Sequence, residues 1–267
     1  MSAIPVYTLH RGHLPLLISM PHAGTHIPDE LGPRYAPQAH AVADTDWHLP
    51  ILYDFARDMG ASLLIATHSR YVIDLNRPPD DVNLYPGQDT TSLCPLDDFD
   101  RARLYLPGQQ PDAAEIAQRR SHYWEPYHQA LQGELARLRG QHEQVALWDA
   151  HSIRSVVPRF FEGKLPDLNL GNNDHQSCAA SMAQALLQAA RGDAAYSTVL
   201  NGRFKGGYIT RHYGKPEAGI QAIQLEMTQC CYMEESAPFA YHEQRAAAVQ
   251  PLLRQLLHIV LQHVQRA

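Results

Sequence analysis

The sequence carries little positive charge and lacks a long apolar run. Its 22 Lys and Arg against 28 Asp and Glu give a formal net charge of −6 at pH 7. There is no basic footprint for nucleic acid, and the scattered cations form no run that would attract a membrane surface. No stretch approaches the length of a membrane span. We therefore expect neither nucleic acid nor membrane as a partner, and small molecules fit better.

The N-terminal segment also lacks a sustained apolar run. Residues 1–15 carry His10, Arg11 and His13 and lack the apolar core of a signal peptide, so we expect a cytoplasmic protein. Cysteine is sparse: the four cysteines form no Cys-x-x-Cys pair. A chain of 267 residues can bury a core without disulfides, so we expect reduced thiols and one domain over residues 1–267.

Apolar segments alternate between strand-like and helix-like patterns, without an internal repeat. The predicted strands are residues 14–20, 62–67, 71–74, 145–149 and 219–225, and the predicted helices are residues 47–59, 111–139, 176–190 and 239–264. Pro251 either kinks the last helix or opens a second one. The alternation predicts an α/β sheet, and the Pro- and Asp-rich segment 76–108 predicts a long loop of the kind that is usually functional.

Three polar side chains stand where predicted strands end: His22, His151 and Glu226. In open α/β sheets that edge holds the ligand crevice. Two imidazoles and a carboxylate suffice for a catalytic zinc, which leaves a position for water. His26 is four residues after His22, but Gly24 and the absence of a His-Glu-x-x-His motif argue against a helical zinc pair.

Carboxylates near these histidines have competing roles. Asp44 and Asp46 precede the predicted helix 47–59, so one of them serves as its N-cap. We favour Asp44 as the structural group and Asp46 as the metal ligand, with His48 as an alternative donor. Glu226 follows an apolar strand and is either a general base or one half of a salt bridge.

Arginines gather on the segment that follows residue 69. Arg70, Asn76 and Arg77 lie close in sequence, and guanidinium groups bind carboxylates in bidentate geometry. Arg154 and Arg211 reach the same crevice from other loops in this interpretation. The alternative for any one of them is ordinary surface charge.

Seven short motifs spread along the chain complete a recognisable pattern. They are Pro21-His-Ala-Gly-Thr-His-Ile-Pro28, Ala43-Asp-Thr-Asp-Trp-His48, Ser69-Arg-Tyr-Val-Ile-Asp-Leu-Asn-Arg-Pro78, Asp149-Ala-His-Ser152, Leu165-Pro-Asp-Leu-Asn-Leu-Gly171, Gly206-Gly-Tyr-Ile-Thr-Arg211 and Leu225-Glu-Met227. Together they resemble the N-formylglutamate amidohydrolases, bacterial enzymes of histidine breakdown, and the resemblance covers nearly the whole chain.

That family is related in fold to the zinc carboxypeptidases. The resemblance implies a three-layer α/β/α domain around a mixed sheet, Zn²⁺ at His22, Asp46 and His151, and Glu226 as base. It also implies that Asn76 and Arg77 grip a substrate carboxylate. Carboxypeptidases carry a glutamate ligand three residues after the first histidine, whereas this sequence has Thr25, so the carboxylate ligand must come from elsewhere.

The implied reaction is hydrolysis of N-formyl-L-glutamate to glutamate and formate. The nearest alternative is a related deacylase or carboxypeptidase-like enzyme that acts on another N-acyl amino acid. Thiol catalysis through Cys230 or Cys231 and a binding module without turnover are the more distant alternatives.

Overall fold

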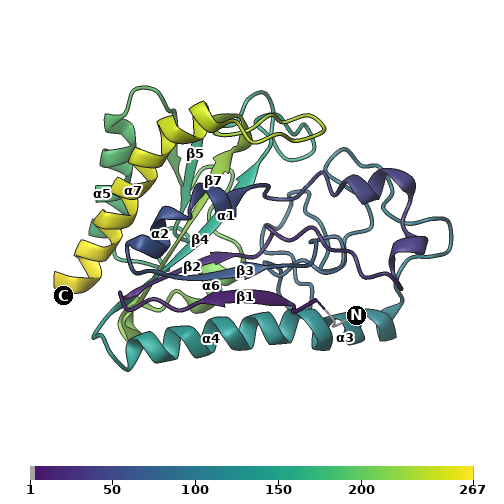
Figure 1. The fold of residues 1–267 in the computed structure, drawn as a ribbon, viewed down its shortest axis with the longest axis horizontal. Coiled ribbons are helices and arrows are strands. Elements are labelled where there is room, and N and C mark those ends of the chain that lie inside the picture. The colour runs from purple at the N-terminus through teal and green to yellow at the C-terminus, as the bar shows by residue number, and fades with distance from the viewer. Residues whose placement is uncertain (1–3, 267) are drawn as a thin grey trace.

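The computed structural model describes residues 4–266, which form one seven-stranded mixed sheet (Figure 1). The strands are β1 (Tyr7–His10), β2 (Leu16–Met20), β3 (Ser62–Ala66), β4 (Val145–Ile153), β5 (Leu168–Gly171), β6 (Thr198–Leu200) and β7 (Ile220–Thr228), in the order β1-β3-β2-β4-β7-β5-β6. The central strands β3, β2, β4 and β7 are parallel, whereas β1 runs antiparallel to β3 and β5 runs antiparallel to β7.

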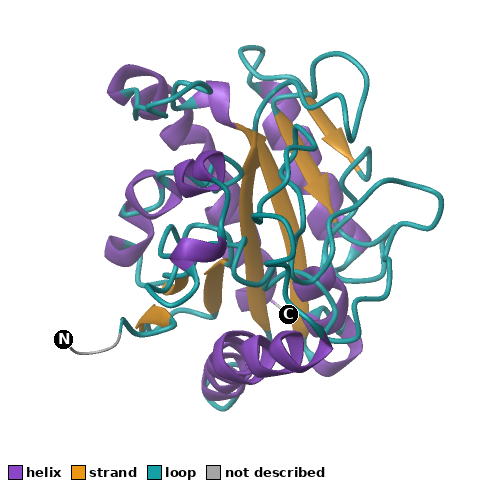
Figure 2. Ribbon diagram, turned by 90° about the vertical axis from the view of Figure 1, so that its right-hand side faces the viewer, coloured by secondary structure: helices purple, strands orange, loops and turns teal. Residues whose placement is uncertain are grey.

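Helices cover both faces of this sheet (Figures 1 and 2). They are α1 (Leu49–Leu52), α2 (Phe55–Asp58), α3 (Ala113–Arg119), α4 (Glu125–Arg139), α5 (Ala180–Gly192), α6 (Tyr208–Tyr213) and α7 (Glu243–Arg266). A π-helical turn, η3 (Arg120–Trp124), joins α3 to α4, and short 3₁₀ turns occupy Gly32–Arg34, Pro37–Ala41, Pro216–Ala218 and Gln229–Cys231. Among residues 4–266, no helix combines the length and the apolar character that a bilayer crossing requires.

Alternating strand residues supply two apolar cores. On β4, Ala146, Trp148 and Ala150 pack towards α1, α2, α5 and α7, whereas Val145 and Leu147 pack towards α4 and α6. The two faces of a strand alternate with period two, so one apolar run serves both layers. The predicted three-layer α/β/α arrangement around a mixed sheet is confirmed.

Two of the predicted elements are wrong in detail. The helix predicted over residues 47–59 is broken at Tyr53 and Asp54 into α1 and α2, and His48 precedes α1 with a left-handed φ of 61°. Residues 71–74 form turns and no strand, because the backbone N–H of Val72 turns back to the carbonyl of Ser69. Pro251 lies inside one continuous helix, α7, and opens no second one.

The unequal lengths of the central strands create the crevice. β2 ends at Met20, and its pairing with β4 ends at Ser19 opposite Asp149. β4 and β7 continue together to Ile153 opposite Thr228. His151 and Glu226 therefore lie within strands that extend past the end of β2, and not after strand ends as predicted.

Candidate active site

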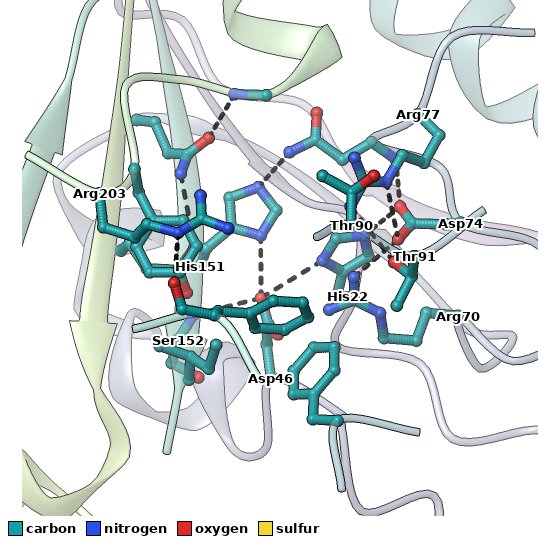
Figure 3. Close-up of a pocket in the computed structure, with 18 of the residues that line it drawn as sticks. His22, Asp46, Arg70, Asp74, Arg77, Thr90, Thr91, His151, Ser152 and Arg203 are labelled. Carbon is teal, nitrogen blue, oxygen red and sulfur yellow. Dashed lines mark hydrogen bonds and ion pairs between the residues drawn. The ribbon is translucent and has the colours of Figure 1, made fainter. Parts of the chain in front are cut away.

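A cavity lies at this step in the sheet, and Figure 3 shows its lining. Residues 76–108 contain no helix or strand, in agreement with the predicted loop, and they contribute Tyr85, Asp89, Thr90, Thr91 and Phe99 to the wall. The other lining residues that matter below are His22, Asp46, Arg70, Asp74, Asn76, Arg77, His151, Arg203, Gln224 and Glu226.

Three buried side chains converge at the bottom of the cavity (Figure 3). Oδ2 of Asp46 lies 3.0 Å from Nδ1 of His151 and 3.8 Å from Nδ1 of His22. The three ligand atoms lie within 4.8 Å of one another, so His22, Asp46 and His151 could hold one metal ion. Nδ1 of His22 is buried and has no hydrogen-bond partner among residues 4–266, which is the state expected of a nitrogen that faces a cation.

The far nitrogen of each histidine faces a second carboxylate. Nε2 of His22 lies 2.7 Å from Oδ1 of Asp74, and Nε2 of His151 lies 3.1 Å from Oδ1 of Asp149. Metal-binding histidines commonly place the other ring nitrogen against a carboxylate, which fixes the ring and leaves the first nitrogen free to bind. The residues present therefore fit a metal ion with two imidazole ligands and one carboxylate ligand.

The two supporting carboxylates are themselves held. Arg70 donates to Oδ2 of Asp74 at 2.6 Å, and the backbone N–H of Asn76 donates to Oδ1 at 2.9 Å. Thr210 of α6 donates its hydroxyl to Oδ2 of Asp149 at 3.0 Å. Burial, followed by the nearby Arg70 cation, lowers the pKa of His22, which favours the neutral imidazole that binds metals.

Local backbone structure places the loop residues. The N–H of Asp46 donates to the carbonyl of His22 at 3.0 Å, and the N–H of Ser152 donates to Oδ2 of Asp46 at 3.2 Å. A Cβ on Gly24 would overlap the backbone of Thr67 and His68, so only glycine lets the segment that carries His22 approach the end of β3 this closely.

Glu226 adjoins the histidine in the sheet. It is the register partner of His151 across β4 and β7, and Gln224 on the same face donates to its Oε2 at 3.4 Å. Burial raises the pKa of Glu226 to about 8, although the charges of His151 and Arg70 act in the opposite direction. No ion pair joins this carboxyl group to an arginine in residues 4–266. A buried carboxyl group that can hold a proton near neutral pH therefore stands in the cavity.

Three arginines line the cavity, and one of them was not predicted. Arg70 is occupied by Asp74, whereas Arg77 lies 3.9 Å from Asp74 and bonds to Thr91. Arg203 forms no ion pair with a carboxylate in residues 4–266, and burial lowers its pKa. Burial likewise lowers the pKa of Arg77. Arg203 thus has no carboxylate partner, and Arg77 has only a long contact with Asp74, which Arg70 already holds more closely.

The prediction that Arg154 and Arg211 reach this cavity is corrected. Arg154 donates to Asp100 at 2.9 Å, and neither arginine lines the cavity. The guanidinium group of Arg211 packs over the ring of Tyr85 and donates to the carbonyl of Gly206 at 2.7 Å. Asn76 lies in the cavity with Nδ2 2.9 Å from Nε2 of His151, and its Oδ1 accepts from the N–H of Ile209.

The competing candidates lie elsewhere. Asp44 caps no helix: its Oδ2 accepts from the backbone N–H of Phe99 at 2.9 Å, while Asp46 faces the histidines. His48 lies 2.7 Å from the carbonyl of Phe239, and His26 meets His68 edge to face. Cys230 and Cys231 are not among the residues that line the cavity.

Comparisons with known proteins agree with this geometry. A family profile described as N-formylglutamate amidohydrolase matches residues 14–233. Proteins named N-formylglutamate deformylase from Pseudomonas aeruginosa and from Pseudomonas putida are each 50% identical over 256 residues, which is 96% of this chain and 96% of each relative. The crystal structure of an N-formylglutamate amidohydrolase from Ralstonia eutropha JMP134 superimposes with a TM-score of 0.83 at 25% identity, covering 98% of this chain and 99% of that one. The chain therefore belongs to the N-formylglutamate amidohydrolase family.

Proposed function

We propose that the protein is a zinc-dependent N-formylglutamate deformylase, which hydrolyses N-formyl-L-glutamate to L-glutamate and formate in histidine degradation. The observation that carries the proposal is the group of His22, Asp46 and His151 beside the protonatable Glu226. The names of the two 50% identical relatives support the substrate. We further propose that residues 1–267 act as one domain in the cytoplasm, as predicted from the sequence.

The metal ligands in this proposal are His22, Asp46 and His151. Two imidazoles and one carboxylate are a ligand set typical of catalytic zinc. A zinc ion held there would polarise the formyl carbonyl and favour ionisation of a water molecule. Asp74 and Asp149 fix the two imidazole rings, and Arg70 holds Asp74 in place.

Glu226 moves the proton in this proposal. Its carboxylate takes a proton from the attacking water and returns it to the nitrogen of the leaving glutamate, so that the C–N bond breaks to give formic acid and a neutral amine. The formic acid then loses its proton, which the amine takes up, to give formate and the ammonium form of glutamate. A raised pKa suits a group that must both accept and donate a proton near neutral pH. Glu226 itself is largely buried, with 8% of its surface exposed.

Arginine side chains bind the two substrate carboxylates in this proposal. Arg203 has no carboxylate partner and Arg77 has only a 3.9 Å contact with Asp74, so these two cations of the cavity are the strongest candidates. Arg70 acts mainly through Asp74, and Asn76 acts beside His151. A local field of this kind explains how an acidic protein binds a dianion, because the nearby charges outweigh the net charge of −6.

The test is formate release from N-formyl-L-glutamate, measured with metal-loaded protein, with chelator-treated protein and with Glu226→Gln. Chelation should abolish turnover, and added zinc should restore it. Glu226→Gln should lower kcat by about a thousandfold while the protein keeps its metal. Glu234→Gln is the matched control, because Glu234 pairs with Arg245 on the surface outside the cavity.

Two results would overturn the proposal. Full turnover in metal-free protein would exclude a metal-dependent reaction, and unimpaired turnover in Glu226→Gln would exclude Glu226 as the base. A panel of N-acyl glutamates and N-formyl amino acids checks the substrate. If a substrate with a bulkier acyl group were turned over faster, the proposed activity would be a related deacylation and not deformylation.

A further inference from the structure

We infer that Asp167, Cys230 and Cys231 form a second cation site, which binds a thiophilic divalent ion such as Zn²⁺ or Cd²⁺. One donor atom from each residue lies within 4.8 Å of the other two. None of the three residues lines the active-site cavity. The site is chemically different from the first, since it offers two sulfur atoms and one oxygen where the first offers two nitrogens and one oxygen.

The three donors surround the buried hydroxyl of Thr228, which hydrogen-bonds to each of them. Oγ1 of Thr228 lies 3.3 Å from Sγ of Cys231, 3.4 Å from Sγ of Cys230 and 3.3 Å from Oδ1 of Asp167. Zinc bound at about 2.3 Å from sulfur and about 2.1 Å from oxygen needs donors roughly 3.5 Å apart. Rotation of the Thr228 hydroxyl away from the centre would let the three donor atoms close around the ion in its place.

The sheet fixes the backbone around the group. Asp167 immediately precedes β5, and the two cysteines follow β7, its antiparallel neighbour. The N–H of Thr228 donates to the carbonyl of Asp167 at 2.9 Å, which ties the two segments together. The donors are therefore positioned before a cation arrives, and little ordering is needed on binding.

The electrostatics also favour a cation. Ser197 donates both its N–H and its hydroxyl to Oδ2 of Asp167, which leaves Oδ1 towards the thiols. Lys164 already places its ammonium group 3.2 Å from Oδ1, and this side chain is 59% exposed, so it can swing into solvent.

Ion entry requires only modest rearrangement. Cys230 is partly exposed, whereas Cys231 is buried behind it. Each thiol that binds releases its proton to water, Lys164 withdraws, and solvent fills the fourth position of the ion. No redox step is involved.

Cadmium titration of the reduced, metal-free full chain tests the inference, because thiolate-to-cadmium charge transfer absorbs in the ultraviolet and the nitrogen and oxygen ligands of the first site give no such band. We expect one equivalent of cadmium to bind with this band. Cys230→Ser/Cys231→Ser should lose the band but still bind cadmium at the first site. Asp167→Asn should keep the band with roughly tenfold weaker affinity, which is about 1.4 kcal/mol.

Matched controls separate this pair from the other cysteines. Cys94→Ala/Cys178→Ala removes the two buried core cysteines and should leave the band unchanged. In the wild type, Cys230 should be the first cysteine alkylated by iodoacetamide, and cadmium should slow that reaction at least tenfold. Absence of the band in the wild type, its survival in Cys230→Ser/Cys231→Ser, or alkylation of Cys230 at an unchanged rate with cadmium would each overturn the inference.

Discussion

The cavity has a strand side and a loop side, and the two are built differently. The strand side consists of Asp149 and His151 on β4 with Glu226 on β7. The loop side consists of His22, Asp46 and the segment 69–77, none of which lies in a strand. Sheet pairing fixes the strand side directly, as in the register of His151 opposite Glu226.

The loop side depends on polar contacts in place of sheet pairing. His22 is held by Asp74, Asp74 is held by Arg70, and Asp46 is held by the backbone of His22. A charged chain of this kind is costly to interrupt, because loss of one member leaves a buried charge without its partner. A substitution that removes one charge should therefore weaken metal binding more on the loop side than on the strand side.

Asp46 joins the two sides, so Asp46→Ala should have the largest effect. Its Oδ2 is the group shared by Nδ1 of His22 and Nδ1 of His151. We expect loss of bound metal and a fall in kcat/KM of at least about a thousandfold, equivalent to about 4 kcal/mol. Metal analysis alongside formate release checks this prediction.

Asp44→Ala is the control for Asp46. Asp44 lies on the same segment and is equally buried, but it bonds to the backbone of Phe99 and not to a histidine. This variant should lose stability and keep its metal. Normal metal content and activity in Asp46→Ala would contradict the assigned role.

The supporting carboxylates compare the two sides directly. Asp74→Asn and Asp149→Asn each remove the charge behind one histidine, and each should weaken metal binding by about 10- to 100-fold. The larger loss is expected for Asp74, because Arg70 then becomes a buried cation without its close partner. Asp149 has Thr210 as its other contact, and that hydroxyl is neutral.

Competition with a chromophoric chelator measures both metal affinities. Circular dichroism spectra of the two variants control for folding. A greater loss in Asp149→Asn than in Asp74→Asn would reverse the comparison of strand side and loop side.

In this proposal the substrate is bound by loop arginines that do not contact the metal ligands. Variants that weaken substrate binding should therefore keep the metal. Arg77→Gln and Arg203→Gln should each raise KM for N-formyl-L-glutamate by about 10- to 150-fold, as expected when a charge-assisted hydrogen bond worth about 1.5–3 kcal/mol is lost. Arg154→Gln should change KM less than about twofold, since Arg154 pairs with Asp100 outside the cavity. Steady-state kinetics on the three metal-loaded variants test this prediction. An equal rise in KM in all three would contradict the assignment of Arg77 and Arg203, and not Arg154, to substrate binding.

The strand side was the more predictable part of the molecule. Apolar runs located the central strands, and the parallel arrangement placed His151 and Glu226 at one edge. The predicted ends were too early, because polar residues such as His151, Ser152 and Glu226 continue both strands past them into the cavity. β1, β5 and β6 were not predicted, since strands of three or four residues give weak periodicity.

The loop side could not be derived from local pattern. The segment that ends at Asp74 resembles a strand in sequence, and its supporting role depends on contact with His22, 52 residues away. Arg203 follows the unpredicted β6, and nothing in its neighbourhood marks it as part of the cavity. The sequence favours Asp46 over Asp44 as the ligand, and the structure adds that Asp46 lies against both histidines. Long-range contacts of this kind leave no spacing signal in the sequence.

Replacement of His128 should have the smallest effect of these changes. It would loosen the contact between the loop side of the cavity and α4. This histidine of α4 lies 2.9 Å from the carbonyl of Leu75 and 2.9 Å from the hydroxyl of Tyr213 on α6. Burial lowers its pKa to about 3. The unfolded chain, with an ordinary histidine pKa of about 6.5, takes up the proton first, so the stabilisation is complete above that pH and is lost as the pH falls.

The main effect of His128→Phe should therefore be on how the free energy of unfolding varies with pH. Its effect on the free energy of unfolding at any single pH should be smaller. From about pH 6 to pH 4, this one site should make the unfolding free energy of the wild type fall by about 1.4 kcal/mol per pH unit. His128→Phe should be less stable at pH 7.5, because two hydrogen bonds are lost, and the difference should shrink on acidification. Urea unfolding at several pH values measures this, with exposed His40→Gln as the control that keeps the wild-type slope. An identical slope in His128→Phe would show that the anchor of the loop side does not titrate in this range.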